Sequence, residues 1–132
     1  MPLTQEDELD ILDLLARYNH AIDGGEAEAW ADTFVSDGLF ESERSGTHRG
    51  RDELVAFARG RAELRGEIRH WTNNPVISGE GDEATMRVYL LLISVDGEPK
   101  PIGTGIYEDT LRKVDGQWKF VHRKVSSDQP VG

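Results

Sequence analysis

The chain divides into a first half with helical periodicity and a second half with strand periodicity. Apolar residues recur every three or four positions between Thr4 and the glycines at 24–25, which predicts a first helix over about 5–23. Thr4 and Asp7 resemble a capping box in which aspartate replaces the usual glutamate. The residues that recur at this helical spacing are Leu9, Leu12, Leu15, Ala16, Asn19 and Ile22.

Two further helices and a short strand are predicted in the first half of the chain. A second helix is expected over about 26–35, and its inward residues are Ala27, Trp30, Ala31 and Phe34. The Ser-Asp-Gly segment at 36–38 ends it, and 39–42 fits a short strand. A third helix is predicted over 51–65, although Gly60 disfavours it. Its apolar positions are Leu54, Val55, Phe57, Ala58, Ala62 and Leu64.

From about residue 67 the apolar period falls from 3.6 to 2. This pattern predicts four strands, which are 67–78, 83–95, 101–113 and 117–126. The Asp-Gly pairs at 96–97 and 115–116 are strong hairpin signals, and Gly79-Glu80-Gly81 is a weaker one. Helices followed by an antiparallel meander predict an α+β fold, built as one domain over residues 1–132.

The second of these strands, 83–95, has no polar face over its latter half. Its alternating apolar residues are Val88, Leu90 and Leu92 on one face, and Leu91, Ile93 and Val95 on the other. In so small a domain the helices can cover only one face of a single antiparallel sheet. We therefore expect self-association as a dimer or trimer; the alternative is a partly exposed apolar face.

Composition narrows the class of protein. The 132 residues are 37% hydrophobic, which suits one compact domain. There is no cysteine, so a disulfide, a thiolate metal site and a cysteine nucleophile are excluded. The four histidines lack metal-ligand spacing, and we expect no metal and no cofactor. No stretch is apolar enough to span a membrane and the N-terminus is acidic, so a cytoplasmic location is expected.

The net charge of −10 is concentrated at the N-terminus. Residues 1–43 hold twelve acidic side chains against the single Arg17, whereas the rest of the chain is almost neutral. Nucleic acids and anionic membranes bind basic surfaces, so neither is an expected partner. The acidic helices are expected to form a solvated face, with the Arg-rich segment 49–69 as an intramolecular or intersubunit complement.

A candidate general base arises from two separate segments. Asp23 precedes two glycines at the end of the first helix, where the helix dipole disfavours a carboxylate. A cationic or hydrogen-bond-donating partner would remove this conflict, and His70 on the strand 67–78 is the candidate partner. The alternatives are a solvated aspartate in a Gly-rich turn and a hydrogen-bonded core histidine.

The strand around His70 has the features of a cavity wall. Alternation places His70, Thr72 and Asn74 on one face, which is polar on an otherwise apolar strand. Pro75 cannot donate to a ladder, so this strand is expected at an edge or to be bulged there.

The first helix offers two further polar groups beside Asp23. Asn19 shares its face at the i,i+4 spacing. Tyr18 lies about 140° round the helix from Asp23 and reaches the same cavity only if the last turn distorts.

The last two strands contribute residues that face inward together. Asp109 and Tyr107 alternate on one of them, and Arg123 faces inward on the other. Arg123 and Asp109 fit a cross-strand ion pair as well as a substrate clamp, and Tyr107 fits a core position. His20, His48 and His122 receive no role.

Nearly the whole chain resembles the SnoaL-like family of the nuclear transport factor two-like superfamily. The matching segments are 12–18, 23–27, 31–38, 50–54, 70–74 and 115–120. The resemblance implies a cone-shaped α+β barrel, in which three N-terminal helices pack on a curved, mainly antiparallel sheet around an apolar pocket. This fold hosts cyclases, dehydratases, isomerases, dehydrochlorinases and non-catalytic binders, so it does not fix the reaction.

The chain is most similar to the branch that includes hexachlorocyclohexane dehydrochlorinase, scytalone dehydratase and bile-acid dehydratase. These enzymes use an Asp-His dyad to take a proton from carbon, and Asp23 and His70 fall on its two members. Arg123 matches an arginine of the dehydrochlorinase pocket. Tyr18 replaces that enzyme's lysine; a tyrosine here is similar to the dehydratases, where a phenol polarises a carbonyl or helps a hydroxyl leave.

The expected function is that of a cofactor-independent lyase or isomerase, of the dehydratase or polyketide cyclase kind. Its substrate is expected to be a small apolar cyclic or carbonyl-containing molecule. The catalytic residues are His70 as base, Asp23 as its orienting carboxylate and Tyr18 as a hydrogen-bond donor. The expected substrate-binding residues are Asn74, Arg123, Tyr107 and Asn19. The alternative is a non-catalytic ligand-binding or oligomerisation domain of the same fold.

Overall fold

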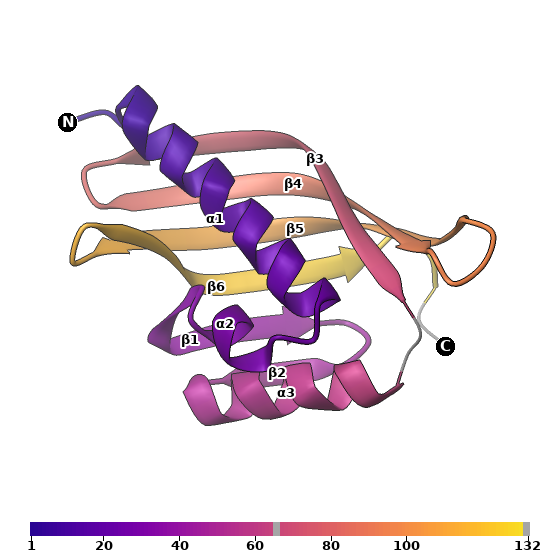
Figure 1. Ribbon diagram of the computed structural model, residues 1–132. Helices are drawn as coiled ribbons and strands as arrows, with labels where there is room; N and C mark the ends of the chain where they lie inside the picture. The colour runs from indigo at the N-terminus through magenta and orange to yellow at the C-terminus, as the bar shows by residue number, and fades with distance from the viewer. Residues whose placement is uncertain (65–66, 131–132) are drawn as a thin grey trace.

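The computed structural model describes residues 1–64 and 67–130, and Figure 1 shows their arrangement. The helices are α1 (Gln5–Asp23), α2 (Ala27–Ala31) and α3 (Arg51–Leu64). The strands are β1 (Phe34–Ser42), β2 (Gly46–Arg49), β3 (Ile68–Glu80), β4 (Glu83–Ser94), β5 (Lys100–Val114) and β6 (Gln117–Ser127). The predicted long helices and the four-strand meander are confirmed to within two residues, apart from residue 65 of the third helix, which lies outside the described residues.

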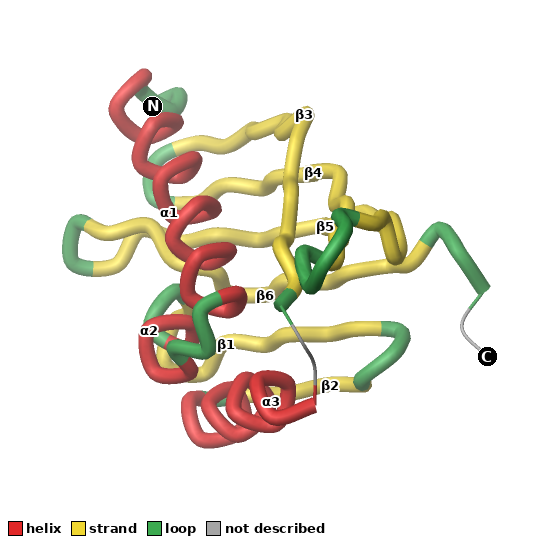
Figure 2. The backbone as a smooth tube through the Cα atoms, turned by 45° about the vertical axis from the view of Figure 1, so that its right-hand side comes forward, coloured by secondary structure: helices red, strands yellow, loops and turns green. Residues whose placement is uncertain are grey.

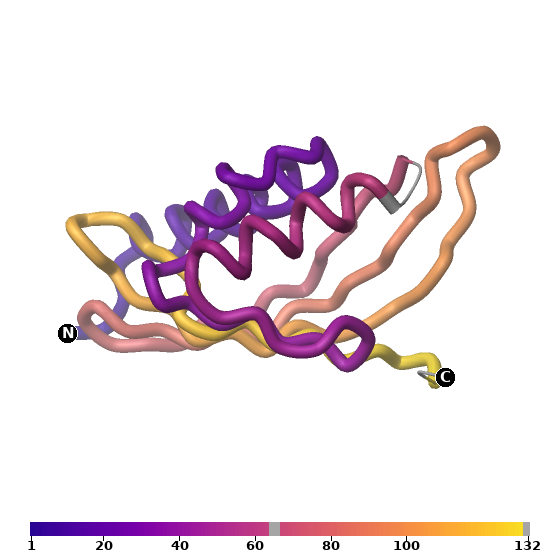
Figure 3. Tube along the Cα trace, turned by 90° about the horizontal axis from the view of Figure 1, so that it is seen from below, coloured from indigo at the N-terminus to yellow at the C-terminus, as the bar shows by residue number. Residues whose placement is uncertain are grey.

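The strands form one curved sheet in the order β2-β1-β6-β5-β4-β3. Neighbouring strands are antiparallel except for β1 and β6, which run parallel. The helices lie on one side of this sheet, and the sheet curls toward them at one end (Figure 3). Helix α1 crosses the meander diagonally, whereas α3 lies beside β1 and β2 (Figures 1 and 2). The predicted α+β class, with N-terminal helices on a curved and mainly antiparallel sheet, is confirmed.

The second helix was predicted too long. It ends at Ala31, and Phe34 already pairs with Phe120 of β6. The Phe120 N–H donates to the Thr33 carbonyl at 2.9 Å, so the chain leaves the helix to join a strand distant in sequence. The short strand β2, which pairs with β1, was not predicted. The first error arises because a local apolar pattern carries no information about a parallel partner more than 80 residues away in the sequence.

The N-terminus of α1 is fixed to the β5-β6 hairpin by the predicted capping box. Thr4 Oγ1 accepts from the Asp7 N–H, and Asp7 Oδ2 accepts from the Thr4 N–H, each at 3.0 Å. Asp7 Oδ1 accepts from Trp118 Nε1 and from Lys113 Nζ, each at 3.1 Å. The bond from the Thr4 N–H, followed by those from Trp118 and Lys113, holds the pKa of Asp7 well below its usual range.

This low pKa gives a prediction about acid stability. A carboxyl whose pKa is depressed on folding stabilises the protein above its unfolded pKa, about 3.9, and loses that contribution as the pH falls below it. Asp7→Asn should therefore lower the free energy of unfolding at pH 7, and the deficit relative to wild type should shrink between pH 5 and pH 2. Urea unfolding across this range measures it. Asp13→Asn, on the exposed face of α1, is the control; a deficit that does not change with pH would contradict the assignment.

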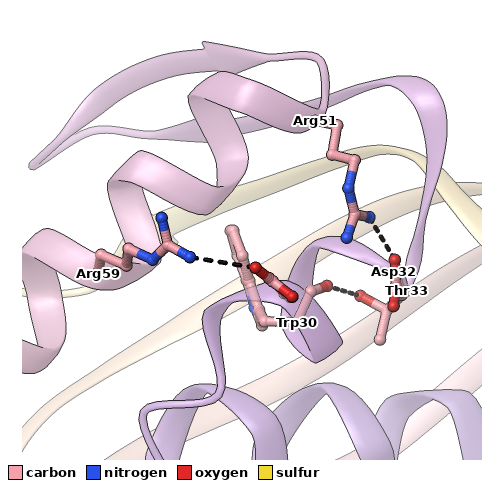
Figure 4. A network of polar contacts seen from close by, with 6 residues as sticks. Trp30, Asp32, Thr33, Arg51 and Arg59 are labelled. Atoms are coloured by element: carbon pink, nitrogen blue, oxygen red, sulfur yellow. Dashed lines mark hydrogen bonds and ion pairs between the residues drawn. The ribbon is translucent and has the colours of Figure 1, made fainter.

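Two exposed ion pairs connect α3 to the segment around α2 (Figure 4). Arg59 Nη2 lies 3.1 Å from Glu28 Oε1, and Arg51 pairs with Asp32. The Arg-rich segment therefore complements the acidic N-terminal helices within the chain, as one of the two predicted alternatives. Exposed pairs contribute at most about 1 kcal/mol each, so packing against the fully buried Trp30 is the stronger link between these helices.

Candidate active site

A cavity of about 280 Å³ lies between the helices and the inner face of the sheet. Most of its wall is apolar, and these side chains are Ile22, Trp30, Phe40, Phe57, Ile68, Leu90, Leu92 and Val125. Polar and charged side chains interrupt that wall, and they include Tyr18, Arg61, His70, Tyr107, Glu43 and Arg44. The remaining lining comes from segments 42–45, 102–105 and 126–127. Its volume lies at the small end of the range for ligand pockets, about 300–1,000 Å³, so it suits a small apolar molecule.

His70 and Asp23 meet at the edge of this cavity. Nδ1 of His70 lies 2.6 Å from Oδ1 of Asp23, and the His70 backbone N–H donates to Oδ2 at 2.9 Å. Both side chains are nearly buried, with 7% and 11% exposed. Two donors on the edge strand β3 thus satisfy the carboxylate at the C-terminus of α1. They remove the conflict with the helix dipole that the sequence indicated.

The contact with Asp23 determines which imidazole nitrogen is basic. A neutral imidazole has one N–H, and a carboxylate can only accept, so the proton of neutral His70 resides on Nδ1. Nε2 is then the basic nitrogen. His70 lines the cavity and Asp23 does not, which places the imidazole between the carboxylate and the cavity. This is the order of groups that general-base catalysis requires.

Tyr18 and Tyr107 are both fully buried side chains in the wall of the same cavity. Their ring centroids lie 6.1 Å apart in an edge-to-face arrangement. Tyr18 lines the cavity although α1 remains α-helical to Asp23, so the condition that the last turn must distort is wrong. Tyr18 itself packs toward the sheet, whereas Asp23 meets the cavity-lining His70. Burial raises the pKa of Tyr18 and that of Tyr107, against an opposing effect of Arg123, so both phenols remain hydrogen-bond donors at neutral pH.

Arg123 lies behind these tyrosines and does not line the cavity. It pairs across the strands with Asp109, Nε to Oδ1 at 3.0 Å, and both side chains are 0% exposed. Its guanidinium carbon lies 3.5 Å from the ring centroid of Tyr107 and 4.3 Å from that of Tyr18. Burial raises the pKa of Asp109 to about 6, and Arg123 opposes this rise. The Arg123-Asp109 ion pair therefore packs behind the rings of Tyr18 and Tyr107, and neither Arg123 nor Asp109 lines the cavity.

The two asparagines predicted to bind substrate also lie away from the cavity. Asn19 Nδ2 donates to Thr72 Oγ1 at 3.0 Å, which ties α1 to β3 beside the Asp23-His70 contact. Asn74 has a φ of 55° at a bulge where the register of β3 and β4 shifts, and its side chain is exposed. Strand alternation predicts the face of Asn74 only for regular pairing, and the bulge breaks that pairing.

The described residues, 1–64 and 67–130, hold neither a candidate metal site nor a candidate membrane span. No group of three or more His, Cys, Asp or Glu side chains there is placed to hold a metal ion. In the same part of the chain, no helix is long and apolar enough to cross a membrane.

The sequence of this chain matches the SnoaL-like domain over residues 4–124. This protein belongs to the SnoaL-like family. No curated protein is significantly similar to it in sequence. The resemblance inferred from the sequence is thereby confirmed.

Solved structures with the same SnoaL-like architecture cover almost the whole chain. A Nostoc punctiforme protein of unknown function with a cystatin-like fold is 30% identical, with a TM-score of 0.92 over 99% of this chain and 98% of its own. A Mycobacterium tuberculosis protein of unknown function is 34% identical, with a TM-score of 0.88 over 96% and 74% of the two chains. A Novosphingobium aromaticivorans protein, provisionally assigned as a scytalone dehydratase, is 28% identical, with a TM-score of 0.83 over 94% and 85%.

Arg61, a charged residue in the lining of the SnoaL-like cavity, was not singled out from the sequence. Arg61 lines the cavity from α3, one turn after Phe57. The apolar series of this helix at 54, 57 and 58 continues to position 61 by helical spacing, and the signal was a charged residue at that position. An isolated arginine at the end of an apolar stripe is usually a solvated residue, which is why the pattern alone did not single it out.

Proposed function

We propose that this SnoaL-like protein is a cofactor-independent lyase or isomerase, of the dehydratase or cyclase kind. It would take a proton from carbon in a small apolar cyclic or carbonyl-containing molecule. The observation that carries the proposal is the imidazole of His70 in the wall of an apolar cavity, with Nδ1 held 2.6 Å from the nearly buried Asp23. Similarity to the provisionally assigned scytalone dehydratase supports the same class of reaction.

The proposed reaction begins with proton transfer from a substrate carbon to Nε2 of His70. The C–H electrons move toward an adjacent carbonyl, and the phenols of Tyr18 and Tyr107 donate hydrogen bonds to the developing enolate oxygen. Asp23 stabilises the imidazolium that forms. In a dehydration the enolate electrons expel a β-hydroxyl, which takes the proton from His70 and leaves as water. In an isomerisation the proton returns to a different carbon.

The alternative from another class is a ligand-binding domain that holds a small molecule without transforming it. The cavity alone fits this alternative equally well. The Asp23-His70 contact favours the enzyme, because a passive apolar binder gains nothing from placing a nearly buried carboxylate behind an imidazole.

Exchange of carbon-bound protons with solvent separates the two proposals without knowledge of the natural substrate. The probe is 2-tetralone, an apolar bicyclic ketone with acidic protons beside its carbonyl, dissolved in D₂O and followed by proton NMR. An enzyme of the proposed kind should accelerate loss of these signals above the rate in buffer. Binding of the ketone with exchange at the buffer rate would support the passive domain and refute the general base.

We further propose that the protein self-associates through the outer face of β3 and β4. Trp71 and Tyr89 lie on the same face of these adjacent strands and are 59% and 52% exposed. Large exposed apolar side chains grouped on a sheet suit a subunit interface. Sedimentation should show a dimer or trimer for wild type and a monomer for Tyr89→Glu. A monomeric wild type at micromolar concentration would refute this proposal.

A further inference from the structure

Arg61 is a cation in the cavity wall without a carboxylate partner among the described residues. It is partly buried, and its guanidinium carbon lies 5.6 Å from the ring centroid of Phe57, one turn earlier on α3. The other arginines on the same helix differ. Arg51 and Arg59 pair with Asp32 and Glu28 on the exposed side (Figure 4). The two outward arginines of α3 therefore have carboxylate partners, whereas the third arginine, Arg61, lines the cavity.

The acidic groups near the cavity do not compensate this charge. Glu43 lines the cavity, but its Oε1 accepts from the Ser127 N–H at 2.6 Å on the side where segments 42–45 and 126–127 meet. Asp23 is outside the lining, where it accepts the two hydrogen bonds of His70. Within the described lining, the groups that act on Arg61 are the Phe57 ring and the phenols of Tyr107 and Tyr18. Arg44, the other arginine of the lining, is exposed and donates to Ser127 Oγ at 3.5 Å.

The partly buried position of Arg61 disfavours a positive charge that has no anionic partner. Burial lowers the pKa of Arg61 from its ordinary value, and the nearby phenols of Tyr107 and Tyr18 oppose this effect. A guanidinium nevertheless stays protonated in proteins, so the wall retains a positive charge. A desolvated cation gains most from an anionic oxygen, and the planar fork of a guanidinium matches both oxygens of a carboxylate.

We propose that Arg61 recognises an anionic group of the ligand, and that this ligand is a small, mostly apolar molecule carrying one carboxylate. The cavity wall supplies apolar contacts for the body of the molecule, and Arg61 supplies its charge complement. This inference rests on the proposed function in one respect, since it takes the same cavity as the ligand site. It adds a substrate class, because a neutral ketone or alcohol would leave the charge of Arg61 uncompensated.

A matched pair of probes tests the preference for an anion. The probes are 1-naphthoate and 1-naphthamide, which share size and shape and differ in charge. Binding is followed by the indole N–H signal of Trp30, which lines the cavity. The indole of Trp118 donates to Asp7 at the far end of α1 and serves as the internal control for binding elsewhere. The two signals are assigned with Trp30→Phe and Trp118→Phe.

Wild type should bind naphthoate at least about tenfold more tightly than naphthamide, as expected for a charge-assisted hydrogen bond. Arg61→Gln should abolish this ratio while the Trp30 signal still responds to naphthamide. Arg61→Lys, which keeps the charge without the fork, should retain part of it. Arg59→Gln, on the same helix but outside the cavity, should bind both probes as wild type does.

The outcomes separate this inference from the proposed function. Equal affinity of wild type for the two probes, both sensed by Trp30, would overturn the role of Arg61 and leave the cavity as a ligand site. A preference that persists in Arg61→Gln would also overturn it. If neither probe moves the Trp30 signal, both the anion preference and the cavity as a ligand site are refuted.

Discussion

Replacing His70 with alanine should lower the rate of enzyme-catalysed proton exchange from 2-tetralone by about 10²–10⁴-fold. The reason is that the proposed reaction needs a base at the carbon, and His70 is the cavity-lining group whose tautomer is set by a carboxylate 2.6 Å away. The measurement is the initial exchange rate in D₂O at saturating ketone, with the rate in buffer subtracted.

A matched histidine controls for an indirect effect. His122 Nε2 donates to Glu41 Oε1 at 3.1 Å, and this histidine is partly exposed and does not line the cavity. His122→Ala should therefore exchange 2-tetralone at the wild-type rate. Wild-type exchange by His70→Ala would exclude His70 as the base, and equal losses in both variants would point to a general loss of structure.

Replacing Arg123 with methionine should cost about 3–5 kcal/mol of folding free energy, the largest stability effect expected for a single residue here. The pair is fully buried, so the substitution leaves the Asp109 carboxylate without its counter-charge among aromatic rings. Equilibrium unfolding in urea measures the loss. The double variant Asp109→Leu, Arg123→Met should recover most of it, because apolar residues of similar volume replace a buried pair at little cost.

The same variant should show a characteristic dependence on pH. The pKa of Asp109 is about 6 in the folded protein, above the unfolded value of about 3.9, and loss of Arg123 should raise it further. A raised carboxyl pKa favours the folded state at low pH, and this contribution is lost as the pH rises through the folded value. The deficit of Arg123→Met relative to wild type should thus be smaller at pH 5 than at pH 7.5. A deficit that is constant, or below about 1 kcal/mol, would contradict a buried and coupled pair.

The sequence predicted those parts of the fold that depend on local chemistry. The capping box at Thr4 and Asp7 is present, and the turn at Asp115-Gly116 has the positive φ angles, 50° and 80°, that the Asp-Gly pair favours. The start of β1 at Phe34 was missed, because its partner is β6 at the other end of the chain. Propensity over 26–35 favoured a continued helix, and a non-local hydrogen-bond ladder replaced it.

The candidate site was predictable where the chemistry was anomalous. A carboxylate at a helix C-terminus indicated that Asp23 needs a donor, and the structure brings His70 to it. Strand alternation predicts which face of the sheet Arg123 occupies. It does not predict whether the side chain reaches a cavity or lies behind Tyr107, as it does in the structure. The bulge at Asn74 moved that side chain outward, and nothing in the sequence distinguished Arg61 from a solvated arginine.

Asp23 and His70 are proposed to act as one unit in proton abstraction. A double-mutant cycle in the 2-tetralone exchange assay tests this directly, with Asp23→Asn, His70→Ala and the two together. We expect Asp23→Asn to slow exchange strongly when His70 is present, and to have no further effect when His70 is already alanine. Independent losses that multiply in the double variant, or an Asp23→Asn protein as fast as wild type, would contradict it.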